Sequence, residues 1–277
     1  MRIRLLLVWI LGAVIAVAGC GTMGGKTSIP PQPHAAPSPS ATTTAPSPSA
    51  VPPSSSAPPS STAPGPALPP SAGPARPPAT LLELGDSGPA VVALQTRLSR
   101  LGYWLGRADG TFGLTTQQAV YALQKAAGLT PDGVYGPKTA AALTRGVLPR
   151  ARSASGHVIE ISLTSNLLLI VDGGKVSTVL NTSTGGGYTY TGGGVTAVAR
   201  TPTGQFRIFR SVDGMDISPL GQLWRPRYFH GGYAIHGSDS IPPYPVSHGC
   251  VRLSYSAIDW IWVTSQARIG TQVLVYH

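Results

Sequence analysis

The chain has 277 residues, only 11% of them charged, and a formal net charge of +10 at pH 7. This length allows one or two domains. The positive charge is spread along the chain without a basic run, so nucleic-acid binding is not expected, whereas an anionic envelope polymer or membrane surface would suit it.

The first twenty residues have the pattern of an export signal. Arg2 and Arg4 precede an apolar run from Leu5 to Val17, which is shorter than the roughly 20 residues of a transmembrane helix. The run ends in Val-Ala-Gly-Cys, which resembles a bacterial lipobox and predicts a lipid on Cys20 in a membrane-anchored lipoprotein. A simple secretory signal and an uncleaved anchor are the alternatives, and all three interpretations place the remaining chain outside the cytoplasm.

Residues 21–80 are expected to form a disordered linker. They hold most of the chain's 28 prolines, mixed with Ser, Ala and Thr. Such a segment has too little apolar material to offset the entropy lost on ordering, and part of it should adopt polyproline conformation.

Residues 81–148 are predicted to form a small all-α module of three helices. Ser87 or Gly88 can cap a helix that opens with Pro89, and Gly102 can close it. A capping box of Thr115 with Gln118 predicts the start of a second helix, which Gly128 ends. A third helix is expected over 137–144.

An internal repeat supports this module. The sequence DGTFG at 109–113 recurs as DGVYG at 132–136, each time before a helix start. Together with GDSG at 85–88 and the leucine pattern at 94–103, the segment resembles the peptidoglycan-binding domain 1 family. The resemblance implies a three-helix bundle that binds wall glycan or peptide, and a helical spacer without ligand is the alternative. Tyr103, Asp109 and Tyr135 are candidate contacts, although aromatic residues in turns are more often core.

Residues 156–277 are predicted to form a mainly β domain of sandwich or barrel-like architecture. Strands are expected over 157–163, 166–171, 176–183, 204–210, 233–237 and 271–277, with one helix over 255–267. The Gly-rich segment 184–194 lacks the context of a phosphate-binding loop, so a hairpin or loop beside a site is expected there.

Cys250 is the residue in this domain most in need of an explanation. If Cys20 carries lipid, Cys250 has no disulfide partner in an oxidising compartment, and an odd cysteine in an exported protein is a candidate reactive thiol. His236 ends an expected strand and could act as its base. Two alternatives stay open: a zinc site of Cys250 with His236, His248 and His230, and a small buried cysteine without chemistry.

The sequence AIHG at 234–237 followed by SHGCVR at 247–252 resembles the signature of the L,D-transpeptidase catalytic domain of the YkuD type. TPTGQF at 201–206 and the segments 213–229 and 231–237 are also similar to parts of that family. The resemblance covers roughly 156–277.

The resemblance implies a role for each residue of the motif. Cys250 would be the nucleophile and His236 its base, with the Gly237 carbonyl orienting the imidazole. The oxyanion pocket would be shaped by the three residues before the nucleophile, Ser247, His248 and Gly249.

Candidate substrate contacts lie around the motif. Arg252 would bind the substrate carboxylate, with a structural salt bridge to Asp239 or Asp259 as the alternative. Tyr233 is a candidate substrate contact. Trp224 and Tyr228 could also line the groove, and core packing is the alternative for all three aromatic residues.

The implied reaction is peptidoglycan 3→3 crosslinking through a cysteine thioester, with release of D-alanine from a tetrapeptide stem. L,D-carboxypeptidase or exchange activity, and a non-catalytic wall-binding lipoprotein, are the alternatives. The expected partners are peptidoglycan stem peptides and glycan, with the membrane reached through the lipid. No cofactor, metal or nucleic acid is expected, a monomer is expected, and carbapenems are expected to acylate Cys250.

Overall fold

The computed structural model describes residues 81–277. The predicted signal with its lipidated Cys20 and the predicted linker over 21–80 lie outside the described residues. Within 81–277, none of the helices has the length and apolar character needed to cross a bilayer.

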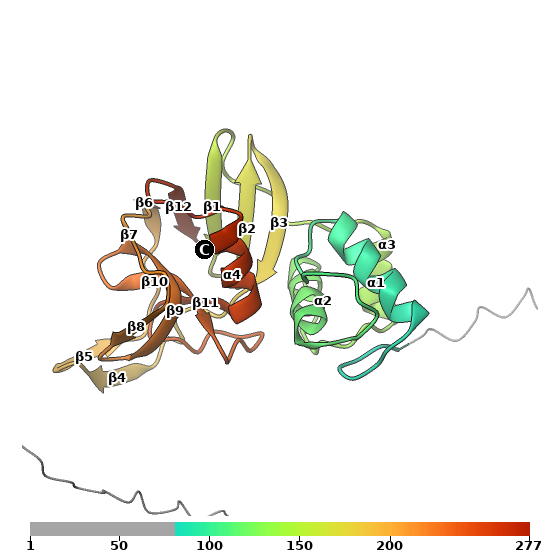
Figure 1. The fold of residues 1–277 in the computed structure, drawn as a ribbon, viewed down its shortest axis with the longest axis horizontal. Helices are drawn as coiled ribbons and strands as arrows, with labels where there is room; N and C mark the ends of the chain where they lie inside the picture. The colour runs from blue at the N-terminus through green and yellow to red at the C-terminus, as the bar shows by residue number, and fades with distance from the viewer. Residues whose placement is uncertain (1–80) are drawn as a thin grey trace, which may run out of the picture. The chain divides into compact units, whose positions relative to one another are not determined.

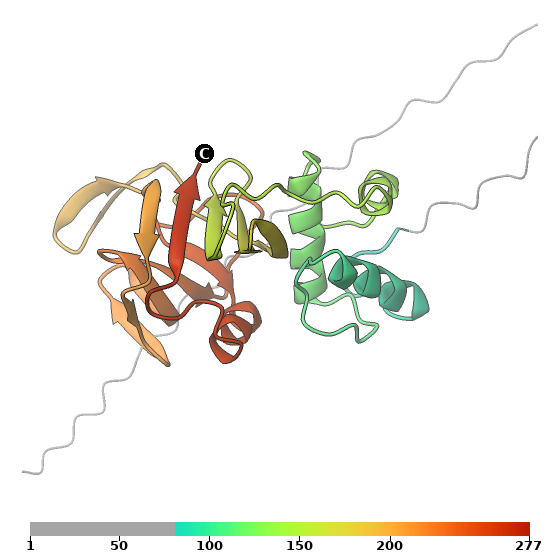
Figure 2. The same cartoon turned by 90° about the horizontal axis from the view of Figure 1, so that it is seen from above.

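Three helices form the first module: α1 (Pro89–Arg100), α2 (Leu114–Ala126) and α3 (Pro137–Thr144), which Figures 1 and 2 show gathered together. Gly88 is the N-cap of α1 and Pro89 its first residue, as predicted. Gly102 follows the helix with a φ of 88°, a left-handed conformation that favours glycine. The predicted capping box at Thr115 is wrong, because the N-cap of α2 is Gly113, two residues earlier, and no side chain caps the helix.

The repeated turns are held by two buried glutamines that the sequence analysis did not single out. Gln95 bonds to Asp109 Oδ1 at 2.9 Å and receives the Gly110 N–H at 2.8 Å. Gln124 makes the matching bonds to Asp132 and Gly133. Asp109 therefore has a structural role in its turn.

The two aromatic candidates in the helical module also serve its core. Tyr103 is buried and its hydroxyl donates to Val147 O at 2.7 Å. Tyr135 is half-buried and packs against the same hydrophobic core. Tyr103 is therefore a core residue, while a wall contact by the half-buried Tyr135 stays a prediction.

The second part of the chain is a mainly β domain, which confirms the predicted fold class. Its strands are β1 (His157–Ser162), β2 (Leu167–Asp172), β3 (Lys175–Asn181), β4 (Thr189–Gly192), β5 (Val195–Val198), β6 (Gly204–Arg207), β7 (Arg210–Ser211), β8 (Met215–Ser218), β9 (Gly221–His230), β10 (Tyr233–Ser238), β11 (Val251–Ser254) and β12 (Gln272–Tyr276). One five-stranded sheet has the order β3-β2-β1-β12-β6. The other has the order β11-β10-β9-β7, with β8 also paired to β9, and β4 and β5 form a separate hairpin.

The two sheets pack around a shared core. Ile159, Ile161 and Val273 from the first sheet and Ile235 and Val251 from the second belong to one buried cluster. Helix α4 (Tyr255–Val263) adds Ile258 and Ile261 to that cluster and lies beside the strands in Figure 1. Ser254 caps α4 by accepting the Ala257 N–H at 3.2 Å.

The sequence prediction differs from this domain in several places, and β8, β9 and β11 were not expected as strands. The strand expected over 204–210 is divided, because β6 pairs with β12 while β7 pairs with β9 of the other sheet. The helix expected over 255–267 ends at Val263, and Ser265 has a φ of 58°. The longest strand, β9, was not predicted, since it contains Pro226 and a left-handed Arg225.

The helical module packs directly on the first sheet. Leu167, Leu169 and Val171 of β2 and Val179 of β3 belong to the same hydrophobic cluster as the cores of the three helices. The module's backbone also pairs with β3, an edge strand, because Trp104 N–H donates to Val179 O at 3.0 Å and Val179 N–H donates to Gly102 O at 2.8 Å.

Candidate active site

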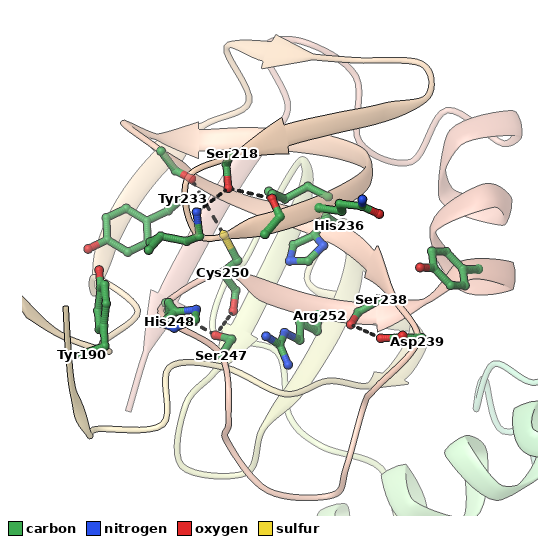
Figure 3. Close-up of a pocket in the computed structure, with 17 residues that line it drawn as sticks. Tyr190, Ser218, Tyr233, His236, Ser238, Asp239, Ser247, His248, Cys250 and Arg252 are labelled. Atoms are coloured by element: carbon green, nitrogen blue, oxygen red, sulfur yellow. Dashed lines mark hydrogen bonds between the residues drawn. The ribbon is translucent and has the colours of Figure 1, made fainter. Parts of the chain in front are cut away.

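A pocket of about 490 Å³ opens on the second sheet, on the side away from the core (Figure 3). It collects most of the predicted site residues from β10, β11 and the loop between them. Those that line it are Tyr233, His236, Ser247, His248, Gly249, Cys250 and Arg252.

Parallel pairing of β10 with β11 explains why these side chains meet. His236 is in register with Arg252, and Ile235 with Val251. Successive side chains of a strand point to opposite faces, so His236 and Arg252 lie on one face while Ile235 and Val251 enter the core. Cys250 immediately precedes β11 and accepts a hydrogen bond from the Ala234 N–H. The nucleophile candidate and the base candidate therefore share the pocket face.

The His236 imidazole is buried, oriented and uncharged near neutral pH. Its Nδ1 lies 2.9 Å from Gly237 O, and because a carbonyl only accepts, Nδ1 carries the hydrogen and Nε2 keeps the lone pair. Burial lowers the pKa of His236 to about 4, with the Arg252 charge acting in the same direction and the Gly237 hydrogen bond opposing it. The side chain is thus prepared to accept a proton at Nε2.

The Cys250 thiol is also neutral at rest. Burial raises its pKa above the ordinary value, which outweighs the opposing effects of the Ala234 N–H and the Arg252 charge. The Sγ lies 3.8 Å from Gly232 O, the acceptor for its weak S–H donor. The pair is therefore a thiol beside an imidazole rather than a preformed thiolate and imidazolium.

The turn before Cys250 is fixed by hydrogen bonds on both sides. Ser247 Oγ donates to Cys250 O at 2.6 Å and accepts the Gly249 N–H at 3.0 Å. Thr201 Oγ1 donates to Gly249 O at 2.7 Å. Ser247 is thus placed to hold the turn that presents the thiol.

Gly249 and Gly237 are required by close contacts. Gly249 has a φ of 144°, and a Cβ there would lie 2.5 Å from Tyr233 Cε1 and 2.7 Å from Arg200 O. A Cβ on Gly237 would lie 2.7 Å from Ile258 Cγ2. Neither position can accept a side chain without movement of its neighbours.

His248 faces the hairpin of β4 and β5, which the Gly-rich segment was expected to place beside a site. Its ring meets Tyr190 edge-on with centroids 4.7 Å apart, and Tyr188 at 5.8 Å. Tyr190 itself lines the pocket. The sequence did not identify Tyr190, although an aromatic residue between two glycine triplets was a usable signal.

The zinc alternative has no support in the geometry. Across residues 81–277, no group of three or more His, Cys, Asp or Glu side chains is arranged to hold a metal ion. His230 packs instead between Phe206, at 4.9 Å, and Tyr233, at 6.0 Å.

The salt-bridge alternative for Arg252 is also wrong. No ion pair within residues 81–277 includes Arg252. Asp259 is instead bonded to Arg225 at 2.9 Å and to the Trp224 indole N–H at 2.8 Å. The guanidinium of Arg252 therefore lines the pocket without a carboxylate partner, while Asp239 lines the same pocket.

Two aromatic candidates belong to the protein interior rather than the pocket. Trp224 packs against the core, with its indole bonded to Asp259. Tyr228 is buried and its hydroxyl donates to Asp216 at 2.8 Å. Tyr233 does line the pocket, so it is the aromatic candidate retained as a substrate contact.

Comparison with known proteins agrees with this geometry. Residues 156–275 match the L,D-transpeptidase catalytic domain, YkuD, and residues 87–143 match PG_binding_1, a peptidoglycan binding domain. The crystal structure of the L,D-transpeptidase (residues 123–326) from Xylanimonas cellulosilytica is 51% identical, with a TM-score of 0.69. The match covers 74% of this chain and 100% of that one.

Two curated relatives are similar over shorter stretches. The N-acetylmuramoyl-L-alanine amidase CwlL of Bacillus licheniformis is 43% identical over 91 residues, which are 32% of this chain and 25% of that protein. The amidase CwlM of Mycobacterium tuberculosis is 45% identical over 73 residues, 26% of this chain and 18% of that protein. The match thus spans a quarter or less of each amidase.

The pocket holds a cysteine and a histidine on one parallel strand pair, within a domain that matches the L,D-transpeptidase catalytic domain. The chain belongs to the L,D-transpeptidase family.

The close packing at Gly249 leads to a prediction with an internal control. Gly249→Ala should lower activity at least about 100-fold, because the new Cβ displaces Tyr233 or the turn that carries the thiol. Gly113→Ala should stay within about threefold, since its Cβ meets nothing within 4 Å and Gly113 lies before α2, outside the pocket. The measurement is the rate of stem-peptide cleavage, and equal losses in both variants would contradict the packing argument.

Proposed function

We propose that the chain is a cysteine-dependent peptidoglycan L,D-transpeptidase that forms 3→3 crosslinks outside the cytoplasm. The observation that carries the proposal is that the neutral His236, with its Nδ1 held by Gly237 O, lines the same pocket as the Cys250 thiol. This arrangement supplies a nucleophile and its base without a cofactor.

Acylation follows from the protonation states of the two groups. Cys250 Sγ attacks the carbonyl of the amide bond after the third residue of a tetrapeptide stem, and its proton passes to His236 Nε2. The tetrahedral intermediate collapses by breaking the C–N bond, and the imidazolium returns the proton to the leaving D-alanine amine. The bond energy of the amide is kept in the thioester, so no ATP is needed.

The backbone of Cys250 is the proposed oxyanion donor. The Gly249 N–H is already donated to Ser247 Oγ, so Gly249 and Ser247 shape the turn while the Cys250 N–H is directed at the developing charge. The Gly237 carbonyl at Nδ1 stabilises the imidazolium that forms during attack. His248 supports the same turn through its contact with Tyr190.

Deacylation uses the same residues in reverse. A side-chain amine of a neighbouring stem attacks the thioester carbonyl and gives a proton to His236, the C–S bond breaks, and His236 reprotonates the thiolate. Arg252, unpaired with any carboxylate in the described chain, is the proposed contact for a substrate carboxylate, with Tyr233 beside it. With water as acceptor, the same cycle would be an L,D-carboxypeptidase.

The other modules fit a wall-bound enzyme. We propose that residues 81–148 contact peptidoglycan, on the strength of the family match over 87–143. We also propose that Cys20 carries the lipid that anchors the exported chain. Metabolic labelling with palmitate tests the anchor, which should label the wild type and not Cys20→Ala.

Product analysis tests the proposed reaction. Incubation of the purified chain with a disaccharide tetrapeptide should release D-alanine and yield a dimer with a 3→3 bond. Cys250→Ala should yield neither. Release of D-alanine with tripeptide and no dimer would overturn crosslinking in favour of hydrolysis, and unchanged turnover by Cys250→Ala would overturn the cysteine mechanism.

The lowered pKa of His236 predicts that activity persists to an unusually low pH. Because the free imidazole of His236 protonates only near pH 4, the base stays available well below its ordinary pKa of 6.5. We expect kcat/KM for stem cleavage to hold its pH 7 value down to about pH 5 and to reach half of it near pH 4. A midpoint at about 6.5 in the same profile would show an imidazole exposed to solvent and contradict the geometry.

A further inference from the structure

The face of α2 that meets the β domain carries a half-buried lysine, Lys125, which has no acidic partner within residues 81–277. Lys125 Nζ donates to Asn166 O at 3.0 Å, Asn181 Oδ1 at 2.5 Å and Thr182 O at 3.1 Å. An ammonium has three N–H bonds, and each meets one acceptor here. Burial lowers the pKa of Lys125 to about 7, which shows the energetic cost of holding this group inside the molecule.

The Asn181 side chain connects Lys125 to the loop between the two candidate catalytic residues, His236 and Cys250. Its Nδ2 donates to Gln118 Oε1 at 2.5 Å, and Gln118 Nε2 donates to Ile241 O at 3.2 Å. Ile241 lies in the loop 239–249, which joins β10 to β11. Gln118 thus reaches this loop directly, and Lys125 reaches it through Asn181, whose Nδ2 also lies 3.5 Å from Ile241 O.

The residues that follow Asn181 hold the rest of that loop. Thr182 Oγ1 donates to Arg252 O at 2.8 Å, and Ser183 Oγ donates to Tyr244 O at 2.8 Å. The Ser247 N–H donates to Thr184 O at 2.9 Å. The segment 181–184 is therefore bonded to Lys125 on one side and to the loop and β11 on the other.

We propose that Gln118 and Lys125 are positioning residues of the active site, which hold the segment 181–184 and the loop 239–249 so that Cys250 meets His236. The helical module is then part of the catalytic apparatus as well as a wall contact. This inference rests on the proposed function. Neither residue lines the pocket. Lys125 acts through Asn181, whereas Gln118 bonds both to Asn181 and directly to Ile241 O.

The expected effect on catalysis follows from the free energy of the hydrogen bonds that Gln118 and Lys125 make. Catalytic groups must be held within about 0.5 Å of their productive geometry. Loss of a hydrogen bond worth about 1 kcal/mol would let the loop leave that geometry and should lower kcat about fivefold to tenfold. KM should change less, because Arg252 and Tyr233 remain on their strands.

The experiment compares four variants of the full-length chain: Gln118→Ala, Gln118→Glu, Lys125→Met and the control Gln117→Ala. Gln117 is the neighbouring residue on the same helix, and its side chain makes no hydrogen bond within residues 81–277. Glu at 118 keeps the size and the acceptor for Asn181 but turns an oxygen toward Ile241 O. Amide hydrogen exchange over 240–249 and kcat for stem cleavage are measured for each.

The proposal predicts faster exchange over 240–249 and lower kcat in all three variants at Gln118 and Lys125. Gln118→Glu should be impaired at least as much as Gln118→Ala. Gln117→Ala should behave like the wild type. A role in bulk packing alone would leave Gln118→Glu near the wild type and would overturn the proposal. Unchanged exchange in Gln118→Ala and Lys125→Met would overturn it as well. If the wild type cleaves no stem peptide, the proposed function fails. The exchange comparison still shows whether Gln118 and Lys125 hold the loop 239–249.

Discussion

The site depends on one constraint, the parallel pairing of β10 with β11. A parallel pair cannot be joined by a tight hairpin, so the chain must leave β10 after Ser238 and return through the loop 239–249. The return places Cys250 at the start of β11 and on the same face as His236. The three prolines of the loop limit the conformations it can take. Strand register thereby sets the positions of His236, the proposed base, Cys250, the proposed nucleophile, and Arg252.

Burial then decides the chemistry of the pair. A cysteine and a histidine exposed to water could exchange a proton before substrate arrives. Here burial raises the pKa of Cys250 and lowers the pKa of His236, so both groups wait in their neutral forms. Charge separation is deferred to the moment of attack, when the Gly237 carbonyl and the Cys250 N–H can stabilise it. A resting neutral thiol is also less exposed to oxidation outside the cytoplasm.

The sequence was sufficient to predict the catalytic motif. It was not sufficient to predict the strand and the helix residues that hold the motif in place. The fourteen-residue spacing between His236 and Cys250 allowed the pair, and the resemblance to the family signature predicted it. Apolar runs and alternation predicted strands near β1, β2, β3, β6, β10 and β12. Pro226 concealed β9, because a proline normally argues against a strand interior. Gln118 and Lys125 have the appearance of a solvated helix face, and only the tertiary contact with Asn181 reveals their role. The shared core of the helices with β2 and β3 likewise depends on packing that a composition boundary near 150 does not disclose.

The central claim is that Cys250 forms a covalent acyl-enzyme with His236 as its base. Intact-mass measurement after incubation with a carbapenem tests it most directly, because the β-lactam ring opens onto the nucleophile and the adduct persists. The account predicts one adduct on the wild type, none on Cys250→Ala, and much slower formation on His236→Ala. An adduct of equal yield on Cys250→Ala, or a wild type that stays unmodified, would contradict it.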